Sequence, residues 1–336
     1  MSEREARLYL SVVTEPGDPQ IAAAVQQRGA EDAWRHLVDA TASDASTLAS
    51  VRTRAERAAQ ILERASSIDA RFIIPGDPEW PTQLADLDGP ASISEQTGAP
   101  LGLWIAGTGN LAELTDAAVT IVGTRACTSY GETAATELAA DLSNAGYTVI
   151  SGGAYGIDAA AHRGAMARRT PTIAVMASGI DTPHPPSHST MFRRIAERGL
   201  VISELPPGEF PTRTRFLARN RVLAALSQGT LLIEAAPRSG ARHTVEWADA
   251  LGRAVMAVPG PVTSSQSHTP HQLISQGVAR LVTSAHAVMD NLAATAPSPA
   301  VPPKSAPSWE RISNPAPSTP ATSPQTAATQ GQTIGP

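Results

Sequence analysis

From about residue 100 onward, short apolar runs alternate with amphipathic segments of helical period. The apolar runs include VTIVG (119–123), YTVISG (147–152) and GTLLIEA (229–235), and helical stretches such as GETAATELAADLSNAG (131–146) separate them. Parallel strands need a crossover connection between them, and this connection is usually a helix. The pattern therefore predicts an α/β fold with an open, doubly wound sheet, and ligand sites in such sheets lie at the carboxyl ends of the strands.

The two flanking segments have different patterns. Residues 1–66 are predicted to form short helices, with breaks at Gly29 and at Ser43 and Asp44. Residues 293–336 contain 10 prolines and three charged residues, so we expect this segment to be disordered. We therefore predict a helical domain over 1–66, the α/β domain over 67–292 and a tail over 293–336.

Charge is unevenly distributed along the chain. Residues 1–118 carry 9 Arg and 18 acidic residues, a net charge of −9, whereas residues 119–292 carry 15 Arg and 12 acidic residues, a net charge of +3. The middle of the chain is thus the candidate for binding an anionic partner. A single cysteine excludes an internal disulfide, and no apolar run approaches the ~18 residues of a membrane span. The start of the chain has no signal-peptide pattern, so we expect a soluble cytoplasmic protein without membrane association.

Two glycine-containing corners follow predicted strands. In VGTRACTSYG (122–131), Gly123 permits close backbone approach, Arg125 suits a phosphate, and free N–H groups at the following helix start favour an anion. The alternative is a plain strand-to-helix corner. In SGGAYGIDAAAH (151–162), Asp158 is expected to cap or shape the loop. His162 is open to three interpretations: an acid–base group, a phosphate donor or a packed helix residue.

A basic stretch, RTRFLARNRVLAALS (213–227), places four arginines within nine positions, with Phe216 among them. Basic groups interleaved with an aromatic near a helix start suit a nucleic-acid backbone. The alternative is a solvated basic face. The scattered histidines lack metal-ligand spacing, and neither a Walker A sequence nor a GxSxG elbow is present. We therefore expect no metal, no cofactor and no catalytic group.

Taken in order, these motifs resemble those of the DNA-processing protein DprA family, also called Smf. The resemblance covers about residues 100–285 and includes SELPPG (203–208), IEAAPRSGARHTVEWADALGR (233–253) and VMAVPG (255–260). It implies an extended Rossmann-type fold with a mostly parallel sheet, preceded by a small SAM-like helical domain. It also implies a non-enzymatic protein that binds single-stranded DNA, loads the recombinase RecA during natural transformation and forms a homodimer.

The resemblance, with the loops above, gives two sets of candidate residues. The expected DNA- and phosphate-binding set is Gly123, Thr124, Arg125, Ser151, Gly152, Gly153, Gly156, His162, Arg215, Arg219, Asn220, Arg221, Ser239 and Gly240. The expected dimer-interface set is Leu273, Ile274, Val278 and Leu281. From these sets we predict that Arg125→Ala, or Arg219→Ala combined with Arg221→Ala, weakens DNA binding and leaves the fold intact.

The sequence departs from the family pattern in several places. HPPSH (184–188) stands where the family has Tyr-Pro-x-x-Asn, so His184 replaces the Tyr and His188 the Asn. Leu217 stands where Pro is usual, and the proline-rich tail stands where many members have a winged-helix domain. Two other functions stay open. One is a Rossmann-type enzyme that cleaves nucleoside monophosphates, although its P-G-G-x-G-T-x-x-E pattern is missing. The other is a nucleotide-sensing module.

Overall fold

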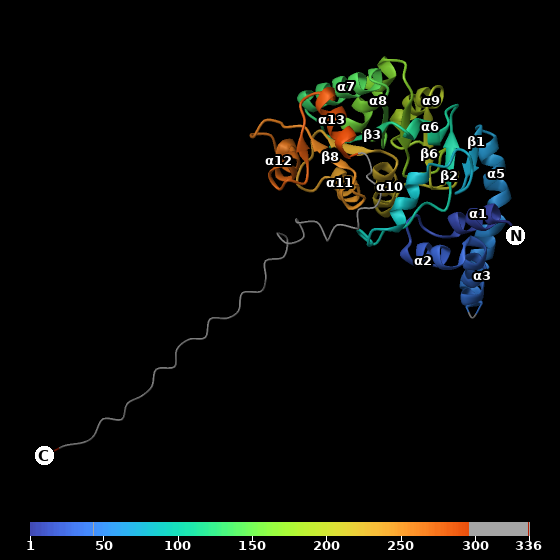
Figure 1. The fold of residues 1–336 in the computed structure, drawn as a ribbon. Helices are drawn as coiled ribbons and strands as arrows, with labels where there is room; N and C mark the ends of the chain where they lie inside the picture. The colour runs from blue at the N-terminus through green and yellow to red at the C-terminus, as the bar shows by residue number, and fades with distance from the viewer. Residues whose placement is uncertain (43, 296–334, 336) are drawn as a thin grey trace.

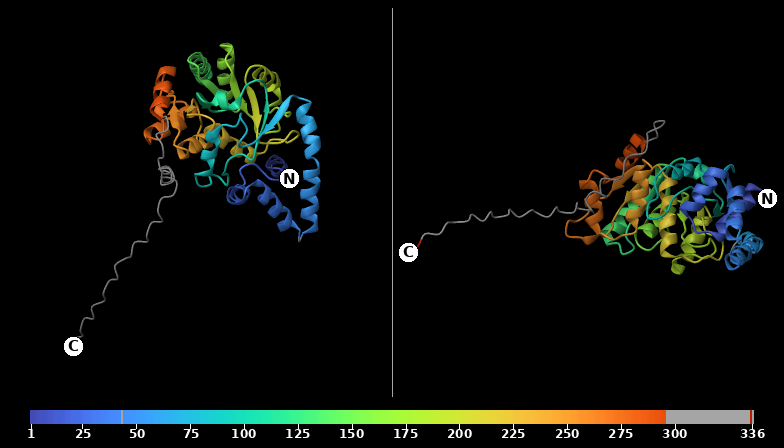
Figure 2. Two further views of the ribbon diagram at one scale, coloured as in Figure 1. Left: turned by 45° about the vertical axis from the view of Figure 1, so that its right-hand side comes forward. Right: turned by 90° about the horizontal axis from the view of Figure 1, so that it is seen from below.

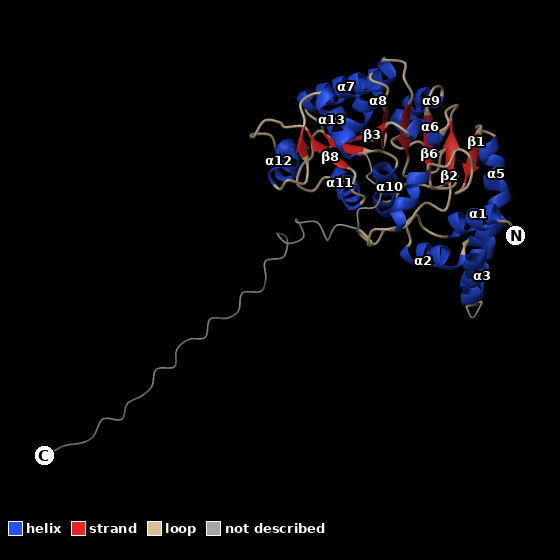
Figure 3. Ribbon diagram, viewed as in Figure 1, coloured by secondary structure: helices blue, strands red, loops and turns tan. Residues whose placement is uncertain are grey.

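A nine-stranded sheet organises the part of the chain that the computed structural model describes, residues 1–42, 44–295 and 335. The strand order is β1-β2-β6-β5-β4-β3-β7-β8-β9, and Figure 3 shows the strands crossing the molecule between helices. β2 pairs antiparallel with β1 and β6, and all other pairs are parallel. The strands are β1 Ala70–Ile73, β2 Leu103–Ala106, β3 Ala118–Val122, β4 Thr148–Ser151, β5 Thr172–Val175, β6 Leu200–Ser203, β7 Gly229–Leu232, β8 Ala254–Ala257 and β9 Arg280–Leu281.

Helices cover both faces of this sheet (Figure 1). Successive strand residues are buried on opposite faces, as in a parallel sheet with two helical layers: Val149 packs on one face and Ile150 on the other. One layer contains α7 Ser129–Asn144, α8 Ile157–Ala167, α9 Ser189–Ala196 and α13 Ala285–Thr295. The other contains η1 Thr82–Asp88, α10 Arg213–Ala225, α11 Ala241–Ala250 and α12 His268–Ser275. Short connections include α6 Leu111–Thr115, η2 Pro186–His188 and η3 Ser265–Ser267.

The first five helices form a separate cluster at the β1 end of the sheet, and α12 and α13 lie at the opposite end (Figure 2). α1 begins with a capping box in which Ser2 and Glu5 bond each other's backbone N–H groups. One face of α1 packs within the cluster through Leu10, and the other reaches Trp104 of the sheet through Leu8 and Val12. The five helices are α1 Glu3–Val13, α2 Pro19–Arg28, α3 Ala30–Thr41, α4 Ala45–Glu56 and α5 Ala58–Ser66. They are hereafter called the helical region.

The strand order creates a crevice at the carboxyl edge of the sheet. The chain runs outward from β3 through β4 and β5 to β6 and then returns to place β7 on the other side of β3. The loops after β3 and β7 therefore diverge, which is where open α/β sheets bind ligands.

The α/β class and the mostly parallel, doubly wound sheet are confirmed. The domain boundaries stay a prediction, and residues 296–334 and 336 of the expected tail lie outside the described part of the chain. No helix in the described residues is long and apolar enough to cross a bilayer.

Candidate nucleic-acid interface

A cavity of about 830 Å³ opens at this crevice. Most of its walls come from three elements: the loop after β3, the N-terminal half of α10 and the loop after β7. The loops after β4 and β5 and the start of α8 add Ala154, His184 and Asp158. Half of the expected DNA-binding set lines it, namely Gly123, Thr124, Arg125, Arg219, Asn220, Ser239 and Gly240. The structure thus brings together three motifs, the first and last of which lie more than a hundred positions apart along the chain.

Arg219 forms the floor of the cavity. Its Nη1 donates to the carbonyl oxygens of Gly152 at 2.8 Å and Val175 at 2.5 Å, and only 7% of the residue is exposed. Burial lowers the pKa of Arg219 to about 10, so the guanidinium is still protonated at neutral pH. A fixed positive charge therefore lies at the base of the cavity.

Asp158, at the start of α8, is the one carboxylate among the described residues that lines the cavity. One of its oxygens accepts from Ala154 N–H at 3.3 Å, which is the loop-shaping role that the sequence suggested. Burial raises the pKa of Asp158, whereas the positive charges of Arg219 and Arg125 act in the opposite direction. Asp158 and Arg219 thus lie together at the floor of the cavity, and the exposed arginines at its mouth supply the accessible positive charge.

Arg125 and Phe216 form a cation–π pair across the mouth of the cavity. The guanidinium carbon of Arg125 lies 4.8 Å from the ring centroid, and that of Arg219 lies 5.8 Å away. His184 meets the same ring edge-on, with 5.8 Å between centroids, so a departure from the family pattern lies directly at the site. Burial and the charge of Arg125 lower the pKa of His184. The half-buried Phe216 ring therefore combines with positive charge, an arrangement that suits nucleic-acid bases next to phosphates.

Two further arginines lie on the rim and were not among the expected binding residues. Arg213, in the first turn of α10, and Arg238, just before the Ser239–Gly240 turn, are both exposed and line the cavity. The sequence could have identified Arg238 as a binding candidate, since it directly precedes a turn at a predicted strand end. Among the described residues, four guanidinium groups and one carboxylate thus line the cavity, three of the guanidinium groups at its mouth.

The glycines of the loop after β4 support the cavity from behind. A Cβ at Gly152 would lie 2.0 Å from the Arg219 guanidinium, so this glycine makes room for the buried arginine. Gly156 has φ +75° and would meet the Thr124 carbonyl at 2.3 Å. Gly153 has φ +67°, and its carbonyl accepts from His188 Nδ1 at 3.0 Å. Thus Gly152, Gly153 and Gly156 shape the site, and none of them lines it.

A buried carboxylate lies at the start of α7, where the sequence predicted N–H groups free to bind an anion. The buried Glu234 carboxylate accepts from Thr128 N–H at 2.9 Å and from the Thr128 hydroxyl at 2.6 Å. A Cβ at Gly131 would lie 2.2 Å from the same carboxylate. An internal anion therefore already fills the position that this helix start offers.

Two residues of the expected set are buried in the packing of the sheet. Ser151 donates its hydroxyl to the Ile121 carbonyl at 2.7 Å, and neither Ser151 nor His162 is exposed. His162 Nδ1 lies 2.9 Å from the Thr172 hydroxyl, and burial lowers its pKa to about 3. Of the three interpretations of His162, the packed helix residue agrees with this geometry.

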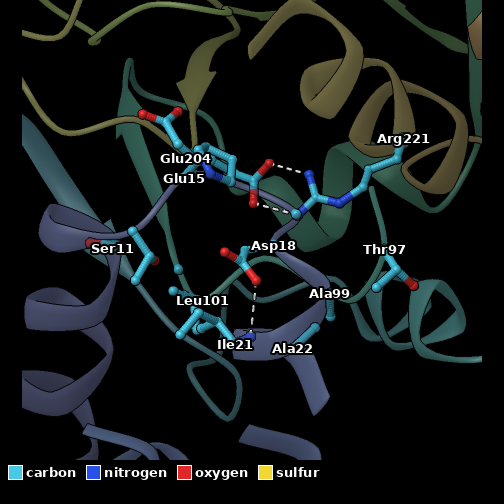
Figure 4. Close-up of a pocket in the computed structure, with 14 residues that line it drawn as sticks. Ser11, Glu15, Asp18, Ile21, Ala22, Thr97, Ala99, Leu101, Glu204 and Arg221 are labelled. Atoms are coloured by element: carbon cyan, nitrogen blue, oxygen red, sulfur yellow. Dashed lines mark hydrogen bonds and ion pairs between the residues drawn. The ribbon is translucent and has the colours of Figure 1, made fainter. Parts of the chain in front are cut away.

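Arg215 and Arg221 point away from the cavity, toward the helical region. Figure 4 shows Arg221 forming a double hydrogen bond with Glu204, and its Nε also donates to the Gly98 carbonyl at 3.0 Å. Arg215 bonds both carboxylate oxygens of Glu15 at 2.8 Å. These two arginines are therefore part of the contact between α10 and its neighbours, so we now expect the Arg221 change to destabilise the fold.

The expected dimer stripe is only partly available. Leu273 is buried in the core, and Ile274 and Val278 pack against that core as half-buried residues. Leu281, in the edge strand β9, is 52% exposed. Because Leu273 is already used within the chain, an interface at this end would depend on Leu281.

Within the described residues, no group of three or more His, Cys, Asp or Glu side chains could hold a metal ion. Cys127 is partly buried, and burial together with nearby carboxylates raises the pKa of its thiol. Neither observation points to metal or thiol chemistry at the cavity.

The chain resembles known proteins over most of its length. The family model described as DNA recombination-mediator protein A matches residues 71–293. The putative DNA processing protein DprA of Mycobacterium tuberculosis is 44% identical over 285 residues, which are 84% of this chain and 73% of the relative. DNA processing protein DprA of Streptococcus pneumoniae is 37% identical over 232 residues, 69% of this chain and 81% of the relative.

Solved structures agree with these relatives. The X-ray structure of the S. pneumoniae protein matches with a TM-score of 0.69 and 30% identity, and the match covers 86% of this chain and 98% of that one. DNA processing protein A from Helicobacter pylori has the same fold, with a TM-score of 0.57 and 24% identity over 68% of this chain and 98% of that one. The chain therefore belongs to the DNA recombination-mediator protein A family, which includes the DprA and Smf proteins.

Proposed function

We propose that this protein binds single-stranded DNA in the cavity at the carboxyl edge of the sheet and helps to load RecA onto that DNA during DNA uptake. The observation that supports this most directly is the set of four guanidinium groups that line the cavity, with the half-buried Phe216 ring among them. The H. pylori relative was solved in a study of its single-stranded DNA binding mode, and it has the same fold.

The proposed binding mode follows from the depth of each group. Arg125, Arg213 and Arg238 lie at the mouth, where they reach strand phosphates, and the Phe216 ring offers a surface on which a base stacks. Arg219, held by backbone carbonyls, supplies charge from below. No covalent step is needed, so we propose a binding protein and not an enzyme.

Anisotropy of a labelled oligo-dT across a salt series tests this proposal. Affinity should fall steeply with salt, and Arg125→Ala should weaken binding and reduce the salt slope by about 1. Arg52→Ala is the matched control, because Arg52 is an exposed arginine of α4 in the helical region. If Arg125→Ala and the parent have the same affinity and slope, the cavity is not the site.

RecA loading is tested separately, by the rate at which RecA assembles on oligo-dT already covered by a single-stranded DNA-binding protein. The wild type should accelerate assembly, and Arg125→Ala should do so less. Release of free base from AMP would instead support the nucleotide-cleaving alternative.

We also propose a homodimer through the β9 end of the sheet. Light scattering of the eluting protein should give twice the chain mass for the wild type and the chain mass for Leu281→Asp. Val262→Asp is the control, because Val262 is an apolar loop residue that is 89% exposed. A dimeric Leu281→Asp variant would place the interface elsewhere.

A further inference from the structure

Five exposed arginines lie at the amino edge of the sheet, opposite the cavity described above. They belong to two segments: the end of α8 with the loop leading into β5, and the end of α9 with the loop leading into β6. β5 and β6 are adjacent and parallel, with Ile173 paired to Leu200, so the two loops lie side by side. The five residues, hereafter called the amino-edge patch, are Arg168, Arg169, Arg193, Arg194 and Arg198.

A second cavity, of about 490 Å³, lies between these two segments. Arg169 from the first segment and Arg194 and Arg198 from the second line it, together with Arg163 of α8. Glu197 is the one acidic residue in the lining. The concave surface is therefore strongly positive and is shared by two helices.

Several arginines of the described residues form ion pairs with carboxylates, but the five arginines of the amino-edge patch do not. Arg163 beside it forms an ion pair with Glu132 at 2.6 Å. None of the five patch arginines forms an ion pair or a side-chain hydrogen bond within the described part of the chain. Arg193 and Arg194 lie in the last turn of α9, where they offset the partial negative charge of the helix end, but no acceptor among the described residues bonds their guanidinium N–H groups. Like charges that lie close together without counter-ions repel each other, so a bound polyanion would remove this electrostatic repulsion.

The patch also lacks the feature that single-strand binding uses at the other edge. Among described residues, the exposed large apolar side chains include Tyr155 and Phe210, and none lies in the two segments of the patch. Binding there would involve phosphates without base stacking. Duplex DNA fits this chemistry, because its bases are already stacked and it presents one phosphate charge per ~1.7 Å of helix axis.

We propose that the amino-edge patch binds the sugar–phosphate backbone of duplex DNA, independently of the cavity at the carboxyl edge. The protein then holds a duplex at one edge of its sheet while a single strand occupies the other. Contact with the duplex is made by guanidinium groups from two helix ends and reads no base sequence.

The test compares two triple variants with the same change in net charge. Arg169→Ser, Arg194→Ser and Arg198→Ser remove the patch arginines that line the cavity. Arg28→Ser, Arg52→Ser and Arg57→Ser remove three exposed arginines of the helical region as the control. Binding of a labelled blunt 20-base-pair duplex and of oligo-dT is measured for both variants across a salt series, after circular dichroism has verified that each is folded.

We expect the patch variant to lose about tenfold or more in duplex affinity and to have a salt slope smaller by about 2 to 3, since each phosphate contact contributes about 0.9 to the slope. Oligo-dT binding should stay within about twofold of the wild type. The control variant should keep its duplex affinity within a similar range, and Arg125→Ala should bind the duplex as the wild type does. Duplex binding by Arg125→Ala therefore distinguishes the present proposal from the single-strand proposal.

Four results would overturn the inference. The first is a wild type that does not bind the duplex at low salt. The second is a control variant that loses as much duplex affinity as the patch variant. The third is an equal loss of oligo-dT binding in the patch variant, which would make the patch an extension of the single-strand path. The fourth is patch-dependent binding of a labelled poly-glutamate peptide without duplex binding, which would identify an acidic protein segment as the partner.

Discussion

Three arginines of α10 and the five arginines of the amino-edge patch are held in opposite ways. On α10, Arg215 and Arg221 are buried against carboxylates and Arg219 against backbone carbonyls. In the amino-edge patch, five arginines are exposed, and none pairs with another described residue. Buried guanidinium groups are part of the fold, and exposed ones are available to a partner. An arginine-rich stretch is thus not by itself a binding site, because the burial of each side chain determines whether it supports the fold or is available to a partner.

The largest expected effect on stability comes from breaking the Arg221–Glu204 ion pair. Arg221→Ala should lower the free energy of unfolding by about 3–5 kcal/mol, because it leaves the nearly buried Glu204 carboxylate without its counter-ion. Urea denaturation followed by circular dichroism measures this. The double variant Arg221→Met, Glu204→Met should recover much of the loss, since both charges are then removed. An unchanged urea midpoint for Arg221→Ala would mean that this pair does not hold the fold.

Arg219→Ala should cost somewhat less, about 2–3 kcal/mol. It leaves the carbonyls of Gly152 and Val175 without their donor, but Asp158 can take up a proton in response, since burial already raises its pKa. Arg125→Ala, at the exposed mouth, should change stability by no more than about 0.5 kcal/mol. Equal destabilisation by Arg219→Ala and Arg125→Ala would contradict the assignment of Arg219 as buried structural support and of Arg125 as an exposed residue at the mouth.

His162 gives a pH-dependent test of α8, the helix that runs between the two edges. Its pKa is about 3 in the folded protein and near 6.5 in the unfolded chain, so between these values the unfolded chain binds a proton that the folded protein does not. Stability is therefore lost as pH falls through this window, by roughly 2 kcal/mol between pH 7.5 and pH 5. His162→Gln should lose less stability over the same interval by that amount. Parallel urea titrations at both pH values decide the matter, and an equal pH response in parent and variant would refute it.

The smallest effect is expected in the amino-edge patch. Arg168→Ser with Arg193→Ser should leave the urea midpoint unchanged or raise it slightly at low salt, with a change within about 0.5 kcal/mol. Removing unpaired like charges relieves repulsion, and added salt should abolish the gain. A clear destabilisation would show that these side chains have structural partners and would erase the contrast between the two edges.

The sequence was sufficient for the fold because its periodicity is local. Strand–helix alternation predicts a parallel sheet, and the position of Gly152 and Gly156 after a strand predicts a tight corner at its carboxyl end. Three motifs of the expected DNA-binding set do line one cavity, because the carboxyl ends of parallel strands meet at one edge of the sheet.

The sequence was less informative about individual side chains. Arg219 and Arg221 are two positions apart on a helix, which places them about 200° around its axis, so only one of them could face the cavity. This much could have been read from spacing alone. The position of the Glu234 carboxylate at the start of α7 could not be predicted in this way, because its partner Thr128 is 106 positions away. A helix start offers free N–H groups only if no distant side chain has reached it first.

The strand order also affects when the sheet can be completed during synthesis. β3 lies inside the sheet between β4 and β7. β4 follows it directly along the chain, but β7 is made much later: the Gln228 side chain accepts from Ala118 N–H across 110 positions. At translation rates of about 5–20 residues per second, one side of β3 waits for several seconds without its native neighbour. During that interval the apolar strand exposes unpaired N–H and C=O groups, so the nascent chain passes through a state in which chaperone binding or mispairing competes with folding.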